Sequence, residues 1–154
     1  MITEGGNENL SEYVTAMIGG QLFGLPILRV QDVFAPHRLT RVPLAPPEIA
    51  GVLNLRGRIV TLIDMRYRLG LDKREAGSQP MAIGVESRGE SYGLLIDKIG
   101  EVLKLDARAR ESNPVNLDPR LARVSAGIHR LEEQLLIVVD VDCVLGIGAK
   151  AMAA

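Results

Sequence analysis

The sequence predicts an all-β fold with short helical connections, and three observations support this prediction. Pairs of short apolar segments are separated by a few turn residues, which is the pattern of β-hairpins. No segment has the long amphipathic periodicity of a surface helix. The two halves of the chain resemble each other, so one small β module occurs twice. At 154 residues, the chain is long enough for one ordinary domain or for two very small modules that share a core.

Four hairpins are predicted, each with glycine or polar residues between its apolar segments: Tyr13–Ile18 with Gln21–Leu25, Gly51–Leu55 with Ile59–Ile63, Met81–Glu86 with Tyr92–Ile96, and Ile128–Leu131 with Leu135–Val139. Short helical turns are predicted between the hairpins, at Leu28–Phe34, Pro47–Ala50 and Met65–Leu69. Asp64 can accept hydrogen bonds from the first amides of the last of these turns. Gly70 can end the same turn in a left-handed conformation.

The repeat consists of two copies, at residues 12–70 and 81–146. Residues 12–34 align without gaps onto 81–103, so that FGLPILRVQDVF matches YGLLIDKIGEVL. Residues 50–70 align without gaps onto 126–146. The offset changes from 69 to 76 because of an insertion in the loop-like segment Lys104–Ser125. A copy of about 65 residues buries little core alone, so the two copies are expected to pack closely.

Positions that both copies share are interpreted as scaffold, and positions that differ are candidates for function. Asp64 and Asp140 recur and are interpreted as helix caps, not as catalytic acids. Gly24 and Gly93 recur too, which suggests a close approach of the backbone inside each barrel. The turn of the second hairpin diverges: Asn54-Leu55-Arg56-Gly57-Arg58 in the first copy corresponds to Arg130-Leu131-Glu132-Glu133-Gln134 in the second. This reversal of charge marks the turn as a candidate site.

The composition favours a cytoplasmic protein without catalytic or metal chemistry. No apolar run approaches the length of about 18 residues of a membrane span, and the polar, acidic start MITEGGNENLSE is unlike a signal peptide. The single Cys143 excludes an intramolecular disulfide. His37 and His129 form no Cys/His pair with metal-ligand spacing, and His129 is interpreted as structural. No phosphate-binding loop or activated serine motif is present, so neither an enzyme activity nor a cofactor is expected.

The charge distribution suggests an acidic partner. Residues 29–74 contain nine Lys and Arg against four Asp and Glu, a balance of +5, while the rest of the chain carries −6. The alternative is that these charges only solubilise the surface. A small nucleic-acid-binding barrel is the second functional alternative. A pI near 6.1 and only five aromatic residues argue against it.

The run VPLAPPEIAGVLNLRGRIVTLIDMRYRLG resembles the signature of the CheW-like domain of bacterial chemotaxis coupling proteins. Three further segments lie where that family has its corresponding segments, namely FGLPILRVQDVF, YGLLIDKIGEVL and LLIVVDVDCVLG. The resemblance implies two intertwined five-stranded SH3-like β-barrels in a single domain at residues 11–147. Residues 1–10 and 148–154 are then expected to be flexible tails. The polar start and the end soon after Leu145 suggest a complete single-domain adaptor.

The resemblance also implies a function in signal transduction. Members of this family link methyl-accepting chemoreceptors to the CheA histidine kinase, in the cytoplasm at membrane receptor arrays. The kinase contact is expected to be barrel against barrel, with the regulatory domain of the kinase and mainly on the second module. The loop Glu111–Leu117 is a further possible kinase contact, although its segment ARESNPVNLDP has fewer prolines than is usual in the family. No single kinase-binding residue is assigned.

The receptor tip is expected to dock in a groove between the two barrels. The positions that match this groove are Val30, Asp32, Val33, Gly51, Asn54, Arg56, Gly57 and Gly93. An apolar groove with a few directional polar groups suits an amphipathic helix. For Val33 a core position is favoured, because Val102 recurs at the equivalent place, whereas Val30 and Asp32 are expected to be exposed on a short turn. Arg56 is a candidate to bind a carboxylate or a helix-end carbonyl, and its alternative is an ordinary hairpin arginine.

Overall fold

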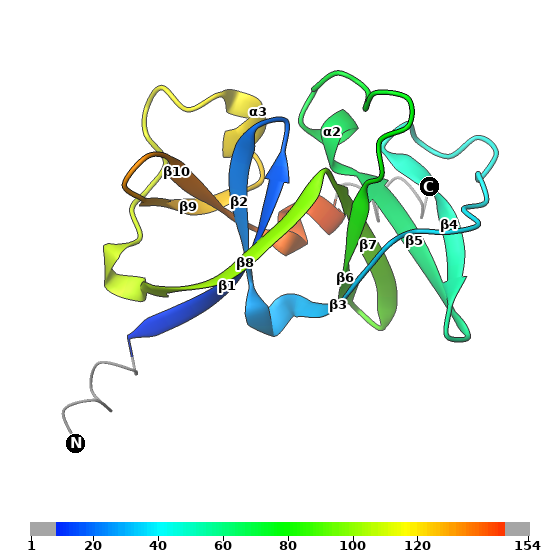
Figure 1. Cartoon of the computed structure of the whole chain (residues 1–154), viewed down its shortest axis with the longest axis horizontal. Helices are drawn as coiled ribbons and strands as arrows, with labels where there is room; N and C mark the ends of the chain where they lie inside the picture. Colours follow the sequence, from blue (N-terminus) through cyan, green and yellow to red (C-terminus); the bar gives the residue numbers. More distant parts are fainter. Residues whose placement is uncertain (1–8, 147–154) are drawn as a thin grey trace.

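The computed structural model describes residues 9–146 and forms two curved five-stranded sheets that lie side by side (Figure 1). Barrel A has the strand order β8 (Lys98–Asp106), β1 (Leu10–Ile18), β2 (Gln21–Pro26), β10 (Leu135–Val139) and β9 (Ser125–Arg130). Barrel B has the order β3 (Val30–Phe34), β6 (Met81–Ser87), β7 (Glu90–Ile96), β5 (Arg58–Asp64) and β4 (Ile49–Leu55). The four predicted hairpins are β1–β2, β4–β5, β6–β7 and β9–β10, and all four are confirmed as antiparallel pairs.

The two repeat copies exchange their first hairpins. The first copy supplies β1 to β5 and the second copy supplies β6 to β10. Barrel A contains β1 and β2 of the first copy, and barrel B contains β6 and β7 of the second. If each strand is replaced by its repeat equivalent, the strand order of one barrel becomes that of the other. Within each barrel, the strands of the two copies meet in one parallel pair. This pair is β2 with β10 in barrel A and β5 with β7 in barrel B. The barrels are therefore intertwined, and neither copy forms a barrel alone.

The connections differ in part from those predicted. The helical turn expected at Leu28–Phe34 is a 3-10 turn, η1 (Ile27–Arg29), followed by the edge strand β3. The turn expected at Pro47–Ala50 is not helical, and Ile49 already begins β4. Part of the segment taken as loop-like belongs to β8, with η2 (Ala107–Ala109) and the short helix α3 (Pro119–Ala122) after it.

The predicted caps are present in both copies. Helix α2 (Met65–Arg68) begins after Asp64, whose Oδ1 accepts a hydrogen bond of 3.0 Å from the Arg66 amide. Gly70 has a φ of +70°, in the left-handed region. Asp140 in turn precedes the helical residues 141–146, and its Oδ1 accepts a bond of 3.1 Å from the Cys143 amide. Both aspartates are N-caps, as the sequence indicated.

One large hydrophobic cluster belongs to both barrels, and each barrel adds a smaller one. The shared cluster includes Phe23 of β2 and Leu94 of β7. Along β10, Ile137 and Val139 lie in the shared cluster, while Leu136 and Val138 lie in the smaller cluster of barrel A. Both faces of such a strand are buried, which explains why the sequence has continuous apolar runs here and no alternation. The shared cluster makes the two barrels one packing unit.

The predicted tails lie almost wholly outside the described residues. Leu10, which was assigned to the first tail, already begins β1. Within residues 9–146, no helix is long and apolar enough to cross a membrane.

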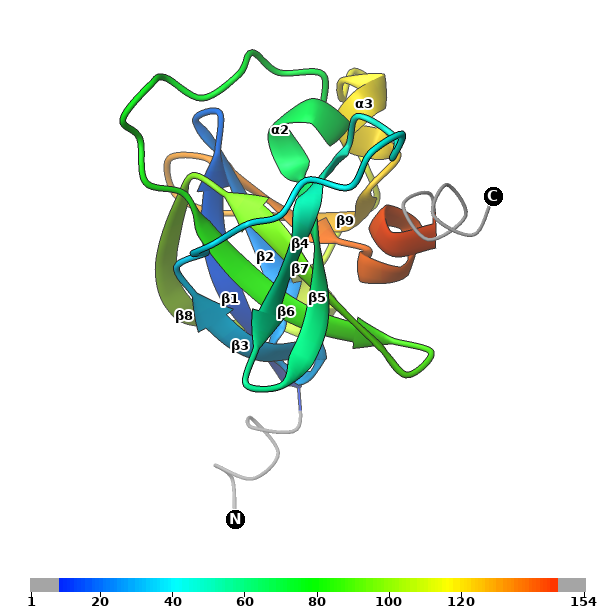
Figure 2. The same cartoon turned by 90° about the vertical axis from the view of Figure 1, so that its right-hand side faces the viewer.

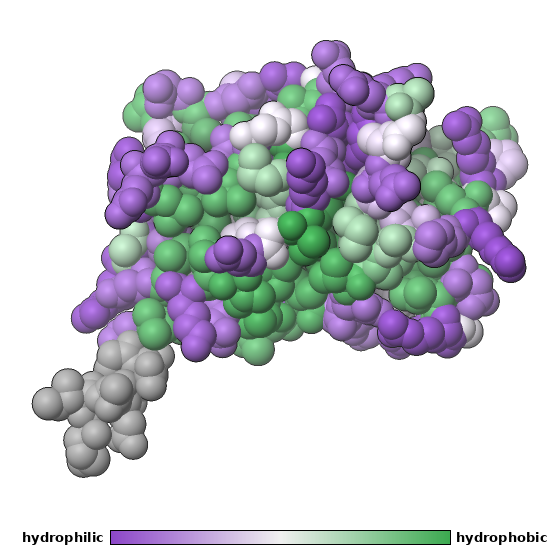
Figure 3. Space-filling view, viewed as in Figure 1, coloured by the Kyte–Doolittle hydropathy of each residue, from purple (hydrophilic) through white to green (hydrophobic). Residues whose placement is uncertain are grey.

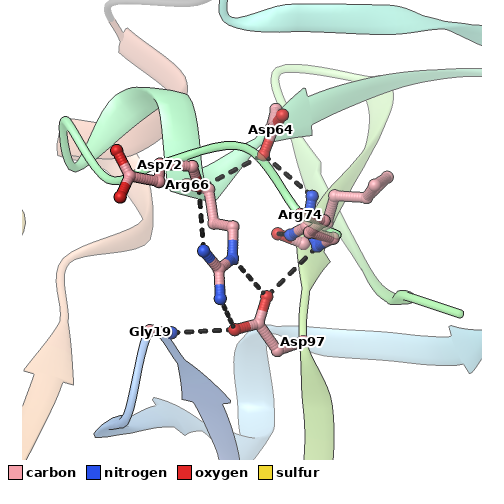
Figure 4. Close-up of polar contacts among 7 residues, drawn as sticks. Gly19, Asp64, Arg66, Asp72, Arg74 and Asp97 are labelled. Atoms are coloured by element: carbon pink, nitrogen blue, oxygen red, sulfur yellow. Dashed lines mark hydrogen bonds and ion pairs between the residues drawn. The ribbon is translucent and has the colours of Figure 1, made fainter. Parts of the chain in front are cut away.

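Four charged residues, Asp64, Arg66, Arg74 and Asp97, link the two barrels (Figure 4). Asp97 lies in the crossover from β7 to β8 and accepts bonds of 2.9 and 2.8 Å from Nε and Nη2 of Arg66. Nε of Arg74 donates to the same carboxylate at 3.1 Å, and Nη1 of Arg74 donates to Asp64 at 3.1 Å. The amide of Gly19, in the β1–β2 turn of barrel A, donates to Asp97 at 2.8 Å. This cluster therefore fixes the linker between the two copies against both barrels.

The cluster predicts an acid-sensitive contribution to stability. Burial alone would raise the pKa of Asp97, but the hydrogen bonds from Arg66 and Gly19 and the charges of Arg66 and Arg74 outweigh it, so the pKa is lowered. A lowered pKa gives stability that is present above the unfolded value of about 3.9 and is lost as pH falls through the folded value. We expect Asp97→Asn to lower the free energy of unfolding by about 1–2 kcal/mol at pH 7. This loss is smaller than that for a fully buried ion pair, because the Asp97 side chain is 20% exposed.

Chemical denaturation at pH 7 and at pH 3 measures this effect, and the difference between the variant and the parent protein should shrink at pH 3. Asp142→Asn is a matched control. Asp142 is the repeat equivalent of Arg66 and pairs with Arg29 at 2.9 Å, but it is 69% exposed and should matter far less. Equal losses in both variants at both pH values would contradict the assignment.

Candidate protein-binding site

The turn between β4 and β5 lies beside the edge strand β3 of barrel B (Figure 2). Arg56 and Gly57 occupy the turn with φ values of +53° and +82°, as a two-residue type I′ turn requires. Oδ1 of Asn54 accepts a bond of 2.9 Å from the Gly57 amide, which holds the turn. Arg88 has the same left-handed conformation in the β6–β7 turn. The conformation of Arg56 is therefore a feature of the turn type and is not by itself evidence of a site.

The Arg56 side chain joins two strands that are distant in the sequence. Its Nη1 donates to Oδ2 of Asp32 on β3 at 2.7 Å. The Arg56 side chain is 75% exposed, whereas that of Asp32 is 22% exposed. Arg56 keeps its other N–H groups available for a partner because only Nη1 has an acceptor within residues 9–146.

A hollow of about 350 Å³ opens beside this ion pair. Its lining comes from β3, from the β4–β5 hairpin and from β6 and β7: Gln31, Asp32, Phe34, Leu55, Arg56, Arg58, Val60, Gly84, Ser91 and Tyr92. Arg58 is 61% exposed and lies 3.9 Å from Glu86, and Nε2 of Gln31 donates to the same carboxylate at 2.9 Å. The lining of the hollow therefore combines apolar side chains with exposed guanidinium groups.

The two edge strands β3 and β8 present equivalent apolar side chains on one face. Val33 on β3 is 37% exposed, and its repeat equivalent Val102 on β8 is 49% exposed. Ile99, the equivalent of the half-buried Val30, is 36% exposed. Figure 3 shows apolar surface across the middle of this face, over β8 and the connection to β3. The interpretation of Val33 as a core residue is therefore wrong, because an edge strand turns this side chain outward.

The structure brings some of the predicted site residues together and separates others. Four of them lie at one end of barrel B, namely Asp32, Asn54, Arg56 and Gly57. Val30 and Val33 follow along β3. Val30 and Asp32 are on a strand and half-buried, not exposed on a turn as expected.

Gly51 and Gly93 are buried and do not reach the surface of this site. A Cβ on Gly51 would lie 2.5 Å from the carbonyl oxygen of Thr40. A Cβ on Gly93 would collide with Leu62 and approach Phe34 to 3.3 Å, and one on Gly24 would lie 2.8 Å from Leu136. The close backbone approach predicted at Gly24 and Gly93 is confirmed.

Six further residues were not predicted from the sequence. Four of them line the hollow, namely Gln31, Phe34, Arg58 and Tyr92, and two are exposed apolar residues, namely Ile99 and Val102. A signal existed for Tyr92 and Val102, since the repeat pairs them with Phe23 and Val33. For Gln31 and Phe34 the signal was hidden, because β3 was not expected to be a strand.

His129 is buried in β9 of barrel A, away from the hollow. Its ring packs edge-on against Tyr13 with centroids 5.5 Å apart, and the residue is 2% exposed. Burial first, and the charge of Arg110 second, lower its pKa, which favours the neutral ring. Across residues 9–146, no group of three His, Cys, Asp or Glu side chains could hold a metal ion. This environment is that of a structural histidine.

The fold and a family comparison identify the class of protein. A family model of the CheW-like domain matches residues 12–147, and the chain therefore belongs to the CheW-like domain family. Members of this family are scaffolding adaptors of chemotaxis signalling. The two-barrel fold predicted from the sequence is confirmed.

Individual relatives agree with this assignment. The chain is 26% identical to "Chemotaxis protein CheW" of Helicobacter pylori, over 90% of this chain and 84% of that protein. It is 28% identical to the protein of the same name from Bacillus subtilis, over 86% of this chain and 85% of that one. Among solved structures, the scaffolding protein TtCheW of Thermoanaerobacter tengcongensis superposes with a TM-score of 0.75 at 30% identity, covering 84% of this chain and 88% of that chain.

Proposed function

We propose that this chain couples chemoreceptors to the CheA histidine kinase, as a non-catalytic adaptor recruited from the cytoplasm to membrane receptor arrays. The observation that carries the proposal is the apolar face made by the edge strands of both barrels, with Val33 and Val102 exposed at repeat-equivalent positions. An apolar face that spans two barrels suits one side of an amphipathic helical hairpin. The polar edge of this face then consists of four residues at one end of barrel B, namely Asp32, Asn54, Arg56 and Gly57.

The proposal assigns the kinase to another part of the surface. Residues of the second copy are spread over both barrels, so a kinase contact on the second module is not a contact with one barrel. The loop Glu111–Leu117 belongs to barrel A, where Glu111 bridges to Ile128 of β9 and its carboxylate accepts from Arg130 at 3.0 Å. Val115 at the tip of this loop is fully exposed. We propose this loop as the kinase contact because it lies on the barrel opposite Arg56.

Arg56→Glu tests the proposal at one residue. Receptor binding should fall at least tenfold, about 1.4 kcal/mol, because the new carboxylate would repel Asp32 and an acidic receptor tip alike. Binding of the kinase should be largely spared. The measurement is the dissociation constant for a chemoreceptor cytoplasmic fragment and, separately, for the kinase regulatory domain.

Arg88→Glu is a matched control, since Arg88 has the same conformation in the turn of another hairpin of barrel B. It should leave receptor binding within about twofold, a difference of about 0.4 kcal/mol. Normal receptor binding by Arg56→Glu, or loss of both partners through misfolding, would remove Arg56 from the site. If the parent protein binds single-stranded nucleic acid in a strongly salt-dependent way and binds no receptor, the nucleic-acid alternative is correct.

A further inference from the structure

His129 is a polar residue inside an apolar cluster. It is 2% exposed, and its Nε2 atom is buried without a hydrogen-bond partner among residues 9–146. On β9 it lies opposite Leu136 of β10, and its ring packs against Tyr13 of β1. Both neighbours belong to the smaller hydrophobic cluster of barrel A. A buried polar atom without a partner is unusual in a folded protein, so this ring needs a reason beyond packing.

The internal repeat shows that packing does not require a histidine at this place. Leu53 of β4 is the repeat equivalent of His129, and it lies opposite Val60, the equivalent of Leu136. Leu53 and Val60 both belong to the smaller cluster of barrel B. The same pair of strands therefore packs with leucine in one barrel and with histidine in the other. What the histidine adds is a group that can take up a proton near neutral pH.

A proton on this ring would create a charge that its surroundings stabilise poorly. The titratable and charged groups that act on or contact the ring are Tyr13, Asp106, Arg110 and Glu111. The two carboxylates are already engaged, Asp106 by Arg108 at 3.1 Å and Glu111 by Arg130 at 3.0 Å. Burial first, and the charge of Arg110 second, outweigh their attraction and lower the pKa of His129. A buried charge without its own hydrogen-bond partner costs far more free energy than a neutral ring does.

The outer side of β9 is bridged by the segment 107–118, called here the barrel A loop (Figure 1). The Glu111 amide donates to the carbonyl of Ile128 at 2.8 Å, and the Ile128 amide donates to the carbonyl of Glu111 at 2.9 Å. Ile128 precedes His129 on this edge strand, and the loop also carries Arg110. Release of the loop would therefore move the repelling guanidinium away and open this edge of β9 to water.

We propose that His129 is a pH-sensitive switch: when its ring takes up a proton, the bridge between Glu111 and Ile128 weakens and the barrel A loop is released from β9. Above an unfolded pKa of about 6.5, the ring is neutral in the folded and the unfolded chain alike, and the bridge holds. Because the pKa in the folded protein is lower, stability is lost as pH falls below about 6.5 through the folded value.

Native-state hydrogen exchange at pH 7.5 and at pH 5.5 tests the switch, with rates corrected for the intrinsic effect of pH on exchange. Both pH values lie above the range in which Asp97 loses its contribution. The amides of Glu111 and Ile128 should lose protection about threefold or more at pH 5.5. Barrel B provides an internal control, because Thr40 and Val52 form the equivalent bridge with two bonds of 2.8 Å. The protection of these two amides should not change.

His129→Leu, which copies barrel B, should abolish the pH-dependent loss at Glu111 and Ile128. His129→Gln removes the titration but keeps a polar side chain, so it gives the same test if the leucine variant does not fold. His37→Gln is the matched control, because His37 is exposed in barrel B, and it should keep the pH dependence of the parent protein.

An NMR titration of the parent protein adds a measurement that needs no variant. The midpoint for the His129 ring should lie below the ordinary value of about 6.5. A midpoint at or above this value would overturn the inference. Unchanged protection of the Glu111 and Ile128 amides at pH 5.5, or a pH dependence that survives in the His129 variants, would overturn it as well.

The effect on the kinase rests on the proposed function, which assigns the barrel A loop to that partner. The dissociation constant for the kinase regulatory domain should rise about threefold or more from pH 7.5 to pH 5.5 with the parent protein. With His129→Leu it should stay the same. If the bridge opens and the kinase affinity stays constant, the switch stands and the loop is not the kinase contact. If the parent protein does not bind the kinase even at pH 7.5, the proposed function fails instead.

Discussion

Truncation of Phe23 to alanine should lower the free energy of unfolding by about 3–5 kcal/mol, the largest loss that we expect from one substitution. Phe23 is fully buried, and its ring lies in the cluster to which both barrels contribute. The cavity left behind would border β2 of barrel A and the strands of barrel B packed against it. The loss should therefore appear in both barrels at once, as one cooperative transition.

Native-state hydrogen exchange can follow the two barrels separately. Amides of the β1–β2 pair report on barrel A, and amides of the β6–β7 pair report on barrel B. Phe23→Ala should lower the protection of both pairs by the same free energy. Val115→Ala, at a fully exposed position, is the control and should change neither. If protection falls in barrel A while barrel B keeps its own, the barrels are independent units and the shared core does not couple them.

Local sequence signals predicted the hairpins and the caps because each depends on residues that are neighbours in the chain. Gly19-Gly20 forces a tight turn whichever sheet the hairpin joins, and Asp64 caps a helix two residues away. The exchange of hairpins between the copies has no such signal. The same β1–β2 pair could add to the strands of either copy with identical local chemistry, so only the resemblance to a known family indicated the intertwined fold.

The edge strand β3 was misread for a related reason. Its residues VQDVF have three apolar side chains, at positions 30, 33 and 34, and this spacing also fits a helical turn. Pairing with β6, whose residues begin about 50 positions later, makes the segment a strand. This error also hid the outward direction of Val33 and the lining residues Gln31 and Phe34.

The candidate site could be predicted only where a residue type was itself unusual. Arg56 was found because its turn differs in charge from the equivalent turn of the second copy. Its partner Asp32, 24 residues away, was named through the family resemblance, and the ion pair between them follows from the curvature of barrel B. Tyr92 was visible as a Phe-to-Tyr difference between the copies, but the hollow that this residue lines is encoded by no sequence pattern.

Gly93→Val should both destabilise the protein and weaken receptor binding, because the added side chain collides with its neighbours inside barrel B. A Cβ on Gly93 would run into Leu62 and press on Phe34 at 3.3 Å, and valine adds two further carbons. Overpacking of this kind costs about 1–3 kcal/mol in the free energy of unfolding, and sometimes more. Because Phe34 lines the hollow, its displacement should also alter the site, so receptor binding should fall by more than the unfolded fraction explains.

Gly24→Val provides the matched comparison, since Gly24 is the repeat equivalent and its Cβ would lie 2.8 Å from Leu136 in barrel A. This variant should lose a similar free energy of unfolding, measured by urea denaturation, but bind the receptor like the parent protein once the folded fraction is taken into account. If Gly93→Val is as stable as the parent protein, the strands do not approach as closely as the structure indicates. If both variants lose receptor binding equally while folded, the effect is a general one of the scaffold and the site does not lie on barrel B.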